Sequence, residues 1–153
     1  MSSPSPVRVA AALIIKDGRF LICRRPDHKA RGGLWEFPGG KLEAGESAAE
    51  ALVRECREEL GVTVIPGPVY MRLTHEYPDL TVELILLQVE EFMGELTMLE
   101  HSELRWVKPA EIDGFDFCPA DGVILDRLRR EGLPGRTKKR ENPLDNGQAI
   151  GYN

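Results

Sequence analysis

Residues 39–62 read GGKLEAGESAAEALVRECREELGV, and this stretch predicts one amphipathic helix with well-marked ends. Ser47, with Glu50 three residues later, forms a capping box, in which each side chain satisfies a free backbone N–H of the other residue. Gly61 stands where helices commonly end on a left-handed residue. The residues at helical spacing, which predict the buried face, are Ala49, Leu52, Val53, Cys56 and Leu60.

Three glutamates, Glu55, Glu58 and Glu59, crowd the last turns of this helix. At the helical repeat they fall within about a 100° sector, away from the predicted buried face. Like charges at this spacing repel, and the negative end of the helix dipole adds to the cost. One interpretation is an acidic face in solvent, partly offset by Arg54 and Arg57. The other is a bound divalent cation, and oxygen ligands without cysteine or histidine favour Mg²⁺ or Mn²⁺.

Apolar runs separated by turn signals predict strands on both sides of this helix. An Asp-Gly pair at 17–18 joins two β-rich runs, 7–15 and 19–25, and predicts a hairpin. Residues 26–41 contain four glycines and two prolines and predict a long ordered loop with a functional role. Further strands are predicted at 62–65, 69–77, 80–92 and 103–107.

The second half of the chain completes the expected fold. Within 80–92 the alternation of apolar residues at every second position predicts a strand with one buried face. Shorter helices are predicted at 109–112 and at 119–132, the latter beginning with Pro119. Strands, helix, strands and helix in this order predict an α+β fold, an α/β/α sandwich in which helices flank a central mixed β-sheet.

Length, charge and cysteine content narrow the class of protein. The 153 residues suffice for one domain, expected at 7–131, with a flexible lead at 1–6 and a poorly anchored tail at 132–153. The net charge of −5 argues against binding a nucleic-acid polymer. Neither a membrane span nor a secretory signal is evident, so no membrane partner is expected. Three isolated cysteines suit a reducing cytoplasm.

The helix stretch also carries a longer motif. It follows G-x5-E-x7-R-E-U-x-E-E-x-G-U, where U is a bulky apolar residue, at Gly40, Glu46, Arg54, Glu55, Cys56, Glu58, Glu59, Gly61 and Val62. Cys56 departs from the expected type, but a buried cysteine behaves as a small hydrophobe. This motif is the Nudix box, and the chain resembles a Nudix hydrolase.

The resemblance extends beyond the box to the MutT branch of that family. It includes RRPDHKARGGLWEFPGGK before the box and ELRWV and CPADGVILDRL after it, over about residues 7–131. It implies a Nudix fold and hydrolysis of nucleoside triphosphates, including oxidised ones such as 8-oxo-dGTP. Attack at the β-phosphorus would give a monophosphate and pyrophosphate. Such an enzyme serves nucleotide-pool sanitisation and DNA repair.

The resemblance also assigns a metal site. Glu55, Glu58 and Glu59 would bind Mg²⁺, with Mn²⁺ as a substitute, together with the carbonyl of Gly39 and a later loop glutamate, Glu100. Either Glu55 or Glu100 would act as the general base. Structural support would come from Gly40 and from a salt bridge between Glu46 and Arg54. Without the resemblance, Glu100 is an exposed loop acid.

Substrate-binding residues follow from the same likeness. Arg25 matches a position that contacts substrate, or is an ordinary charge at a strand end. The loop residues Glu36, Phe37, Pro38 and Gly39 would line the nucleotide pocket. Trp35 and Phe37 would stack on a base or belong to the core. The histidine that some MutT proteins carry after Arg25 is absent.

Asp121 would determine base preference, or is simply an acid at a helix N-terminus. An ionised carboxylate accepts hydrogen bonds, and therefore favours the N7–H of 8-oxo-guanine or the N4 amino group of cytosine over normal guanine, whose N7 is an acceptor. A protonated Asp121 would discriminate less. His28, His75 and His101 are not spaced as metal ligands and are expected at the surface or in structural roles.

Three other functions remain open at this point. One is a pyrophosphohydrolase of CTP or modified dCTP. Another is a hydrolase of ADP-ribose or a nucleoside-diphosphate sugar, for which Pro78 is a weak indication. The third, from a different class, is a non-catalytic nucleotide-sensing domain, although such domains usually lose box glutamates. The partner in every case is a small nucleotide, and the protein is expected to be a monomer or a homodimer.

Overall fold

The computed structural model describes residues 5–135, and its sheet is built around strand β1 (Val7–Lys16). On one side β1 pairs antiparallel with β4 (Gly39–Lys41) and with β2 (Arg19–Arg24). On the other side it runs parallel to β7 (Thr81–Val89). One parallel pair among antiparallel ones confirms the predicted mixed sheet.

The remaining strands extend this sheet or form a small second one. β2 also pairs with β3 (Trp35–Glu36) and with β9 (Glu103–Val107), while β6 (Val69–Glu76) forms the far edge beside β7. A separate two-stranded sheet consists of β5 (Thr63–Ile65) and β8 (Glu91–Met93). Of its two strands, β5 follows directly after α1 along the chain, whereas β8 follows β7.

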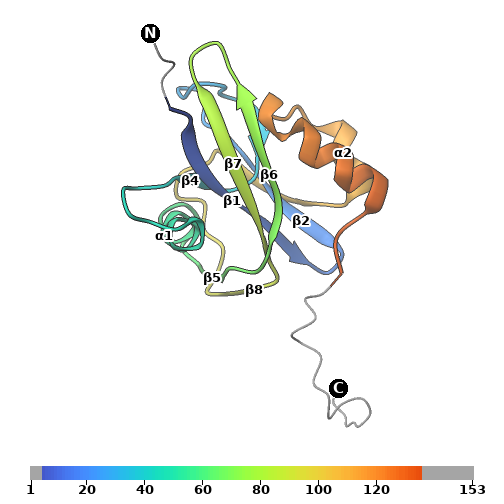
Figure 1. Cartoon of the computed structure of the whole chain (residues 1–153). Coiled ribbons are helices and arrows are strands. Elements are labelled where there is room, and N and C mark those ends of the chain that lie inside the picture. The colour runs from blue at the N-terminus through green and yellow to red at the C-terminus, as the bar shows by residue number, and fades with distance from the viewer. Residues whose placement is uncertain (1–4, 136–153) are drawn as a thin grey trace.

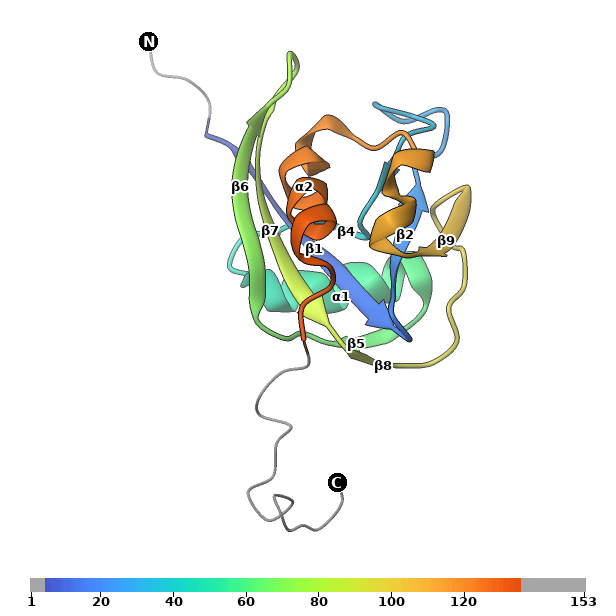
Figure 2. The same ribbon diagram turned by 90° about the vertical axis from the view of Figure 1, so that its right-hand side faces the viewer.

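Helices cover the two faces of the main sheet. α1 (Ala48–Leu60) lies on one face and α2 (Gly122–Glu131) on the other, as the two views show (Figures 1 and 2). Two 3₁₀ helices, η1 (Pro109–Gly114) and η2 (Pro119–Asp121), lie on the α2 side. The predicted α/β/α sandwich is therefore confirmed.

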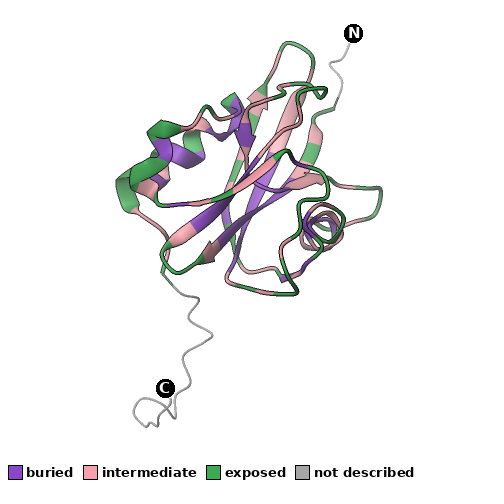
Figure 3. Ribbon diagram, turned by 180° about the vertical axis from the view of Figure 1, so that it is seen from behind, coloured by how far each residue is buried: buried purple, intermediate pink, exposed green. Residues whose placement is uncertain are grey.

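Two apolar clusters fill the space between these layers. Because successive side chains of a strand point to opposite faces, β1 contributes to both clusters. The α1 side includes Ala10, Ala12, Ile14, Leu52, Cys56 and Leu60. The α2 side includes Ala11, Leu13, Phe20, Ile22, Ile124, Leu125 and Leu128. Buried residues concentrate along the central strands, and the outer side of α2 is exposed (Figure 3).

The predicted ends of α1 are confirmed. Ser47 Oγ accepts from Glu50 N at 3.1 Å, and Glu50 Oε1 accepts from Ser47 N at 2.9 Å. Gly61 has a φ of 70° and donates to the carbonyl of Arg57. The buried face differs slightly from the prediction: Ala51 is fully buried, whereas Ala49 and Val53 are only partly buried.

Three other elements differ from the sequence prediction. The predicted loop 26–41 contains β3 and β4, whose few residues form strands only because β2 and β1 offer pairing partners. The predicted strand 80–92 divides into β7 and β8, and burial is continuous from 84 to 89 instead of alternating. Continuous burial follows because β7 lies between two strands with both faces covered. The helix expected at 119–132 begins as the 3₁₀ turn η2.

Several expectations concern the chain ends and the cysteines. The lead at 1–6 and the tail at 132–153 fall largely outside the described residues. Within residues 5–135 no helix has the length and apolar character needed to cross a membrane. Cys23, Cys56 and Cys118 are free and buried.

Candidate active site

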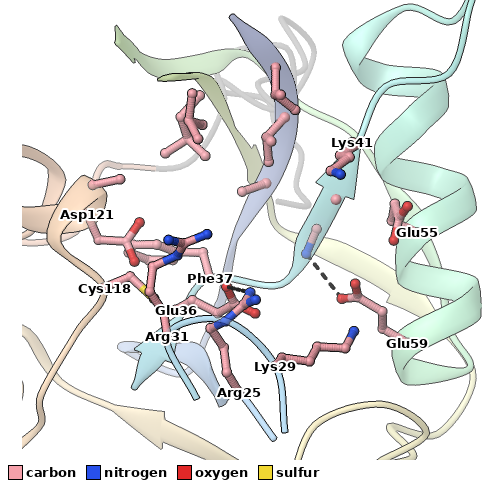
Figure 4. Close-up of a pocket in the computed structure, with 18 of the residues that line it drawn as sticks. Arg25, Lys29, Arg31, Glu36, Phe37, Lys41, Glu55, Glu59, Cys118 and Asp121 are labelled. Carbon is pink, nitrogen blue, oxygen red and sulfur yellow. Dashed lines mark hydrogen bonds and ion pairs between the residues drawn. The ribbon is translucent and has the colours of Figure 1, made fainter. Parts of the chain in front are cut away.

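A cavity of about 400 Å³ opens between α1, the strands β1 and β4, and the segment around η2 (Figure 4). Glutamates of α1 form one end of it, and Cys118 and Asp121 lie at the other end. Side chains of the loop after β2, among them Arg25 and Lys29, lie between these ends. Segments from both ends and the middle of the described chain therefore build one site.

Two glutamates of α1 form the acidic end. The backbone N–H of Gly39 donates to Glu59 Oε1 at 3.2 Å (Figure 4). The Glu55 carboxylate lies where a Cβ atom on Gly40 would stand. Gly39 has a φ of 151°, and a Cβ atom there would overlap the carbonyl of Ala10. Gly39 is therefore required for β4 to lie against β1, whereas a side chain on Gly40 would displace the Glu55 carboxylate.

The electrostatics of this end suit a cation. Burial raises the pKa of Glu59 above its ordinary value, and the neighbouring Glu55 carboxylate raises it further. Arg54 NH1 donates to Glu55 Oε2 at 2.9 Å, on the side of the helix that faces the loop after β4. Two carboxylates this close favour a shared proton or a bound cation. Their hard oxygen atoms fit a divalent ion such as Mg²⁺ or Mn²⁺.

The other two predicted metal ligands, Glu58 and Glu100, contact cationic side chains instead. Glu58 is exposed, lies 3.4 Å from Arg54 NH1 and is not part of the cavity lining. Glu100 does line the cavity, but it pairs with Lys29 at 3.0 Å. Within residues 5–135 no three His, Cys, Asp or Glu side chains are grouped as a metal ion would require. The structure thus brings Glu55 and Glu59 together, with Glu100 in the same cavity and Glu58 outside it.

Arg54 ties the loop before α1 to the helix. Its Nε and NH2 atoms donate to both carboxylate oxygens of Glu46, at 2.8 and 2.9 Å, and NH2 also donates to the carbonyl of Lys41 at 2.9 Å. The hydrogen bonds from Arg54 lower the pKa of Glu46 to about 2, and the bonds to Glu46 raise the pKa of Arg54. The expected salt bridge between these residues is therefore present, in a two-pronged geometry.

Asp121 forms the opposite end of the cavity. It is 5% exposed, and its Oδ2 atom is buried with no hydrogen-bond partner among the described residues. Burial raises the pKa of Asp121 well above its ordinary value, and Glu36 adds to that rise. Its backbone N–H donates to the carbonyl of Cys118 as the 3₁₀ turn closes. An unsatisfied, buried carboxyl oxygen at a cavity wall is a site for a ligand's hydrogen bond.

Of the predicted substrate residues between the two ends of the cavity, some line its wall and others belong to the hydrophobic core. Arg25 and Glu36 line the cavity and form a salt bridge at 3.0 Å. Phe37 also lines it and stacks on Phe20, with ring centroids 5.9 Å apart. Pro38 is buried and accepts a backbone hydrogen bond from Ala12, so it supports the wall. Trp35 packs in the core against Phe115 and is not among the lining residues.

Sequence reasoning missed several lining residues. His101 was expected at the surface or in a structural role; it is 8% exposed, lines the cavity and contacts Glu36. Arg31 lies over the Tyr77 ring, 4.2 Å from its centroid, and both residues line the cavity. The only sequence signal for His101 was its place directly after Glu100. The other missed lining residues include Lys29, Lys41, Leu80 and Cys118.

Comparisons with known proteins show the family of the chain. The sequence matches the NUDIX domain family over residues 10–127, which is more than half of the chain. The CTP pyrophosphohydrolase of Escherichia coli strain K12 is 39% identical over 120 residues, covering 78% of this chain and 89% of that protein. The 8-oxo-dGTP diphosphatase of Haemophilus influenzae is 33% identical over 126 residues, covering 82% and 93%.

Solved structures have the same fold. The MutT protein from Methanosarcina mazei Go1 gives a TM-score of 0.76 at 30% identity, covering 87% of this chain and 100% of that one. The solution structure of the E. coli ORF135 protein gives 0.74 at 37% identity, covering 85% and 94%. The resemblance expected from the box is confirmed: the chain belongs to the NUDIX hydrolase family.

Proposed function

We propose that this protein is a Mg²⁺-dependent nucleoside triphosphate pyrophosphohydrolase that releases a monophosphate and pyrophosphate. The observation that carries the proposal is that one cavity holds paired carboxylates at one end and a buried carboxyl group at the other. A nucleotide along this cavity would have its phosphates at Glu55 and Glu59 and its base at Asp121. An oxidised purine triphosphate such as 8-oxo-dGTP is the first candidate substrate.

NUDIX hydrolases generally use divalent metal ions. In this chain Glu55, Glu58, Glu59 and Glu100, with the Gly39 carbonyl, would hold Mg²⁺, and Mn²⁺ would substitute for it. The bound ion supplies charge neutralisation for the phosphates and acidifies a water.

The chain's own residues supply the other requirements of phosphoanhydride hydrolysis. Glu55 or Glu100 would accept the proton of the attacking water, since both carboxylates face the cavity. Arg25 would contact a phosphate or the sugar from the cavity wall. Arg54 and Glu46 keep the loop before α1 against the helix, so that Glu55 stays at its place.

Base preference would follow from the protonation of Asp121. When ionised, its free oxygen accepts a hydrogen bond from the N7–H of 8-oxo-guanine or from the cytosine amino group, and normal guanine offers no such donor at N7. When protonated, it also donates, and the discrimination weakens. Burial favours the protonated form in the unliganded chain.

A pyrophosphohydrolase of CTP or modified dCTP is the second candidate. It is supported by the E. coli CTP pyrophosphohydrolase, which is 39% identical to this chain. The Asp121 carboxylate accepts equally well from a cytosine amino group, so the cavity alone favours neither base. In both cases we propose a cytoplasmic enzyme of nucleotide-pool sanitisation that serves DNA repair, acting as a monomer or homodimer.

A substrate panel tests the proposal. Pyrophosphate release is measured with Mg²⁺ for 8-oxo-dGTP, dGTP, CTP and dCTP, and AMP release is measured for ADP-ribose. We expect turnover of at least one triphosphate, with 8-oxo-dGTP preferred over dGTP. Release of AMP from ADP-ribose without triphosphate turnover would instead indicate a nucleoside-diphosphate-sugar hydrolase, and tight binding without turnover would indicate a sensing domain.

Glu59→Gln tests the metal assignment on the same substrates. We expect kcat to fall by about 100-fold or more, because a half-buried ligand oxygen loses its charge. Glu95→Gln, an exposed position outside the cavity, is the matched control and should keep the wild-type rate. An unchanged rate in Glu59→Gln would show that the metal assignment is wrong.

A further inference from the structure

His101 is a buried histidine on the cavity wall for which the proposed reaction gives no role. Its side chain is only 4% exposed, and it lies in the segment that leads into β9. Its Nε2 atom lies 3.0 Å from Oε2 of Glu36. Because an ionised carboxylate only accepts hydrogen bonds, Nε2 carries the proton in this contact.

The other oxygen of Glu36 has a donor of its own. Arg25 NH1 donates to Glu36 Oε1 at 3.0 Å, and Arg25 Nε donates to the carbonyl of Ala30 at 2.7 Å. The Glu36 carboxylate is therefore held by one donor on each oxygen, from segments on either side of it in the sequence. All three side chains, Arg25, Glu36 and His101, line the cavity.

The contact with His101 limits the rotation of the Glu36 carboxylate, which the backbone of β3 does not fix. Glu36 lies in β3, which has only two residues, and its side chain is 22% exposed at the cavity. A carboxylate held at one oxygen can rotate, whereas donors on both oxygens fix its plane. Charge-assisted hydrogen bonds weaken when their geometry is lost. Loss of the His101 donor would therefore also loosen the Arg25 guanidinium.

We propose that His101 is a positioning residue of the nucleotide pocket, which acts through Glu36 to hold Arg25 in place for the substrate. The proposal rests on the proposed function for the identity of that substrate. A purely structural anchor would change stability but not substrate affinity. A positioning residue changes the KM and leaves the chemical step nearly intact.

The side-chain chemistry provides matched variants. Nδ1 of His101 is buried without a hydrogen-bond partner among the described residues, so only Nε2 is needed for the contact. Glutamine carries an N–H donor at about the same reach as Nε2, whereas leucine has a similar volume and no donor. His101→Gln should therefore restore what His101→Leu removes. His28→Leu, at an exposed position, is the control.

The experiment measures KM and kcat with Mg²⁺ and the best triphosphate of the panel. We expect His101→Leu to raise KM about 10-fold and to change kcat by less than about 3-fold, as expected for loss of binding contacts. His101→Gln should lie within about 3-fold of the wild-type KM. In a Glu36→Gln background, His101→Leu should add less than about 2-fold, because coupled residues are non-additive. Equal KM values for wild type and His101→Leu, or full additivity with Glu36→Gln, would overturn the proposal.

A binding measurement separates this proposal from the proposed function. The probes are α,β-methylene analogues of dGTP and CTP, titrated calorimetrically with Mg²⁺. If the wild-type chain hydrolyses no triphosphate but binds an analogue, the proposed function fails, and weaker binding by His101→Leu with recovery in His101→Gln still supports positioning. Equal affinities in the two variants and the wild type overturn it. Absence of both turnover and binding in the wild type overturns both proposals.

Discussion

The carboxylate of Glu55 occupies the space that a side chain on residue 40 would need. Gly40→Ala should therefore push Glu55 out of the acidic end of the cavity. We expect kcat/KM to fall about 100-fold, since a displacement of about 1 Å in a reacting group has that effect. Steady-state kinetics of the purified variant measure it.

Gly114→Ala is the matched control for this substitution. A Cβ atom on Gly114 meets nothing within 4 Å, so the variant should keep wild-type kinetics. A Gly40→Ala enzyme with an unchanged kcat/KM would show that the close approach of Glu55 to β4 is not needed for activity.

Arg54→Lys should lower activity although it preserves the charge. Lysine lacks the planar fork that contacts both oxygens of Glu46, so the loop before α1 should lose its fixed position. We expect kcat/KM to fall about 10-fold. Arg57→Lys is the control, because Arg57 is exposed and its side chain donates to the hydroxyl of Thr63. Equal kinetics of the two lysine variants would contradict the supporting role of Arg54.

The salt bridge between Arg54 and Glu46 makes the stability of the protein depend on pH. Hydrogen bonds from Arg54 lower the pKa of Glu46 from 4.5 to about 2 in the folded state. The unfolded state therefore binds more protons between these values, and the stabilisation is present above 4.5 and lost as the pH falls through about 2. The difference in Tm between wild type and Arg54→Lys should shrink over that range. A constant difference would argue against the ionic contact.

Asp121→Asn should stabilise the protein at neutral pH. Burial raises the pKa of Asp121, so the folded state keeps a proton that the unfolded state loses above about 3.8. Stability from this group is full below that pH and is lost as the pH rises through the folded-state pKa. Asparagine does not titrate, so the Tm of Asp121→Asn relative to wild type should increase with pH. A gain of 1 kcal/mol corresponds to roughly 4 °C for a domain of this size.

The substrate preference of Asp121→Asn is measured together with its Tm. If Asp121 accepts a hydrogen bond from the base, Asp121→Asn should reduce the preference for 8-oxo-dGTP over dGTP by about 10-fold or more. An unchanged preference together with the Tm gain would mean that Asp121 is buried beside the pocket without selecting the base.

The parts of the fold that were predictable depend on local interactions. Ser47, Glu50 and Gly61 specify the ends of α1 through contacts within a few residues, and the Asp17-Gly18 turn specifies the first hairpin. β3 and β4 were missed because their pairing depends on β1 and β2, which present the partners. The continuous burial of β7 likewise depends on its place between β1 and β6.

In the site, too, residues fixed by local spacing were predictable, and residues fixed by tertiary contacts were not. The glutamates of α1 follow from the motif, because one helix carries them at fixed spacing. His101 was placed at the surface or in a structural role because its contact, Glu36, lies 65 residues away in the sequence. Glu58 and Glu100 were expected beside Glu55 and Glu59, but each pairs instead with a nearby cation, Arg54 or Lys29. The Lys29–Glu100 contact joins segments 71 residues apart, which residue spacing does not reveal. Arg54 and Glu58, in contrast, are an i,i+4 pair on one helix, whose spacing is equally compatible with this contact and with a shared metal ion.

The central claim is that Glu55 and Glu59 tolerate each other because a divalent cation binds them. Anomalous diffraction from crystals soaked in Mn²⁺ with an α,β-methylene nucleotide tests it most directly. We expect a Mn²⁺ peak coordinated by both carboxylates, with Glu58 and Glu100 turned from Arg54 and Lys29 toward it. A map without a peak between these carboxylates, with the nucleotide bound elsewhere, would contradict the account.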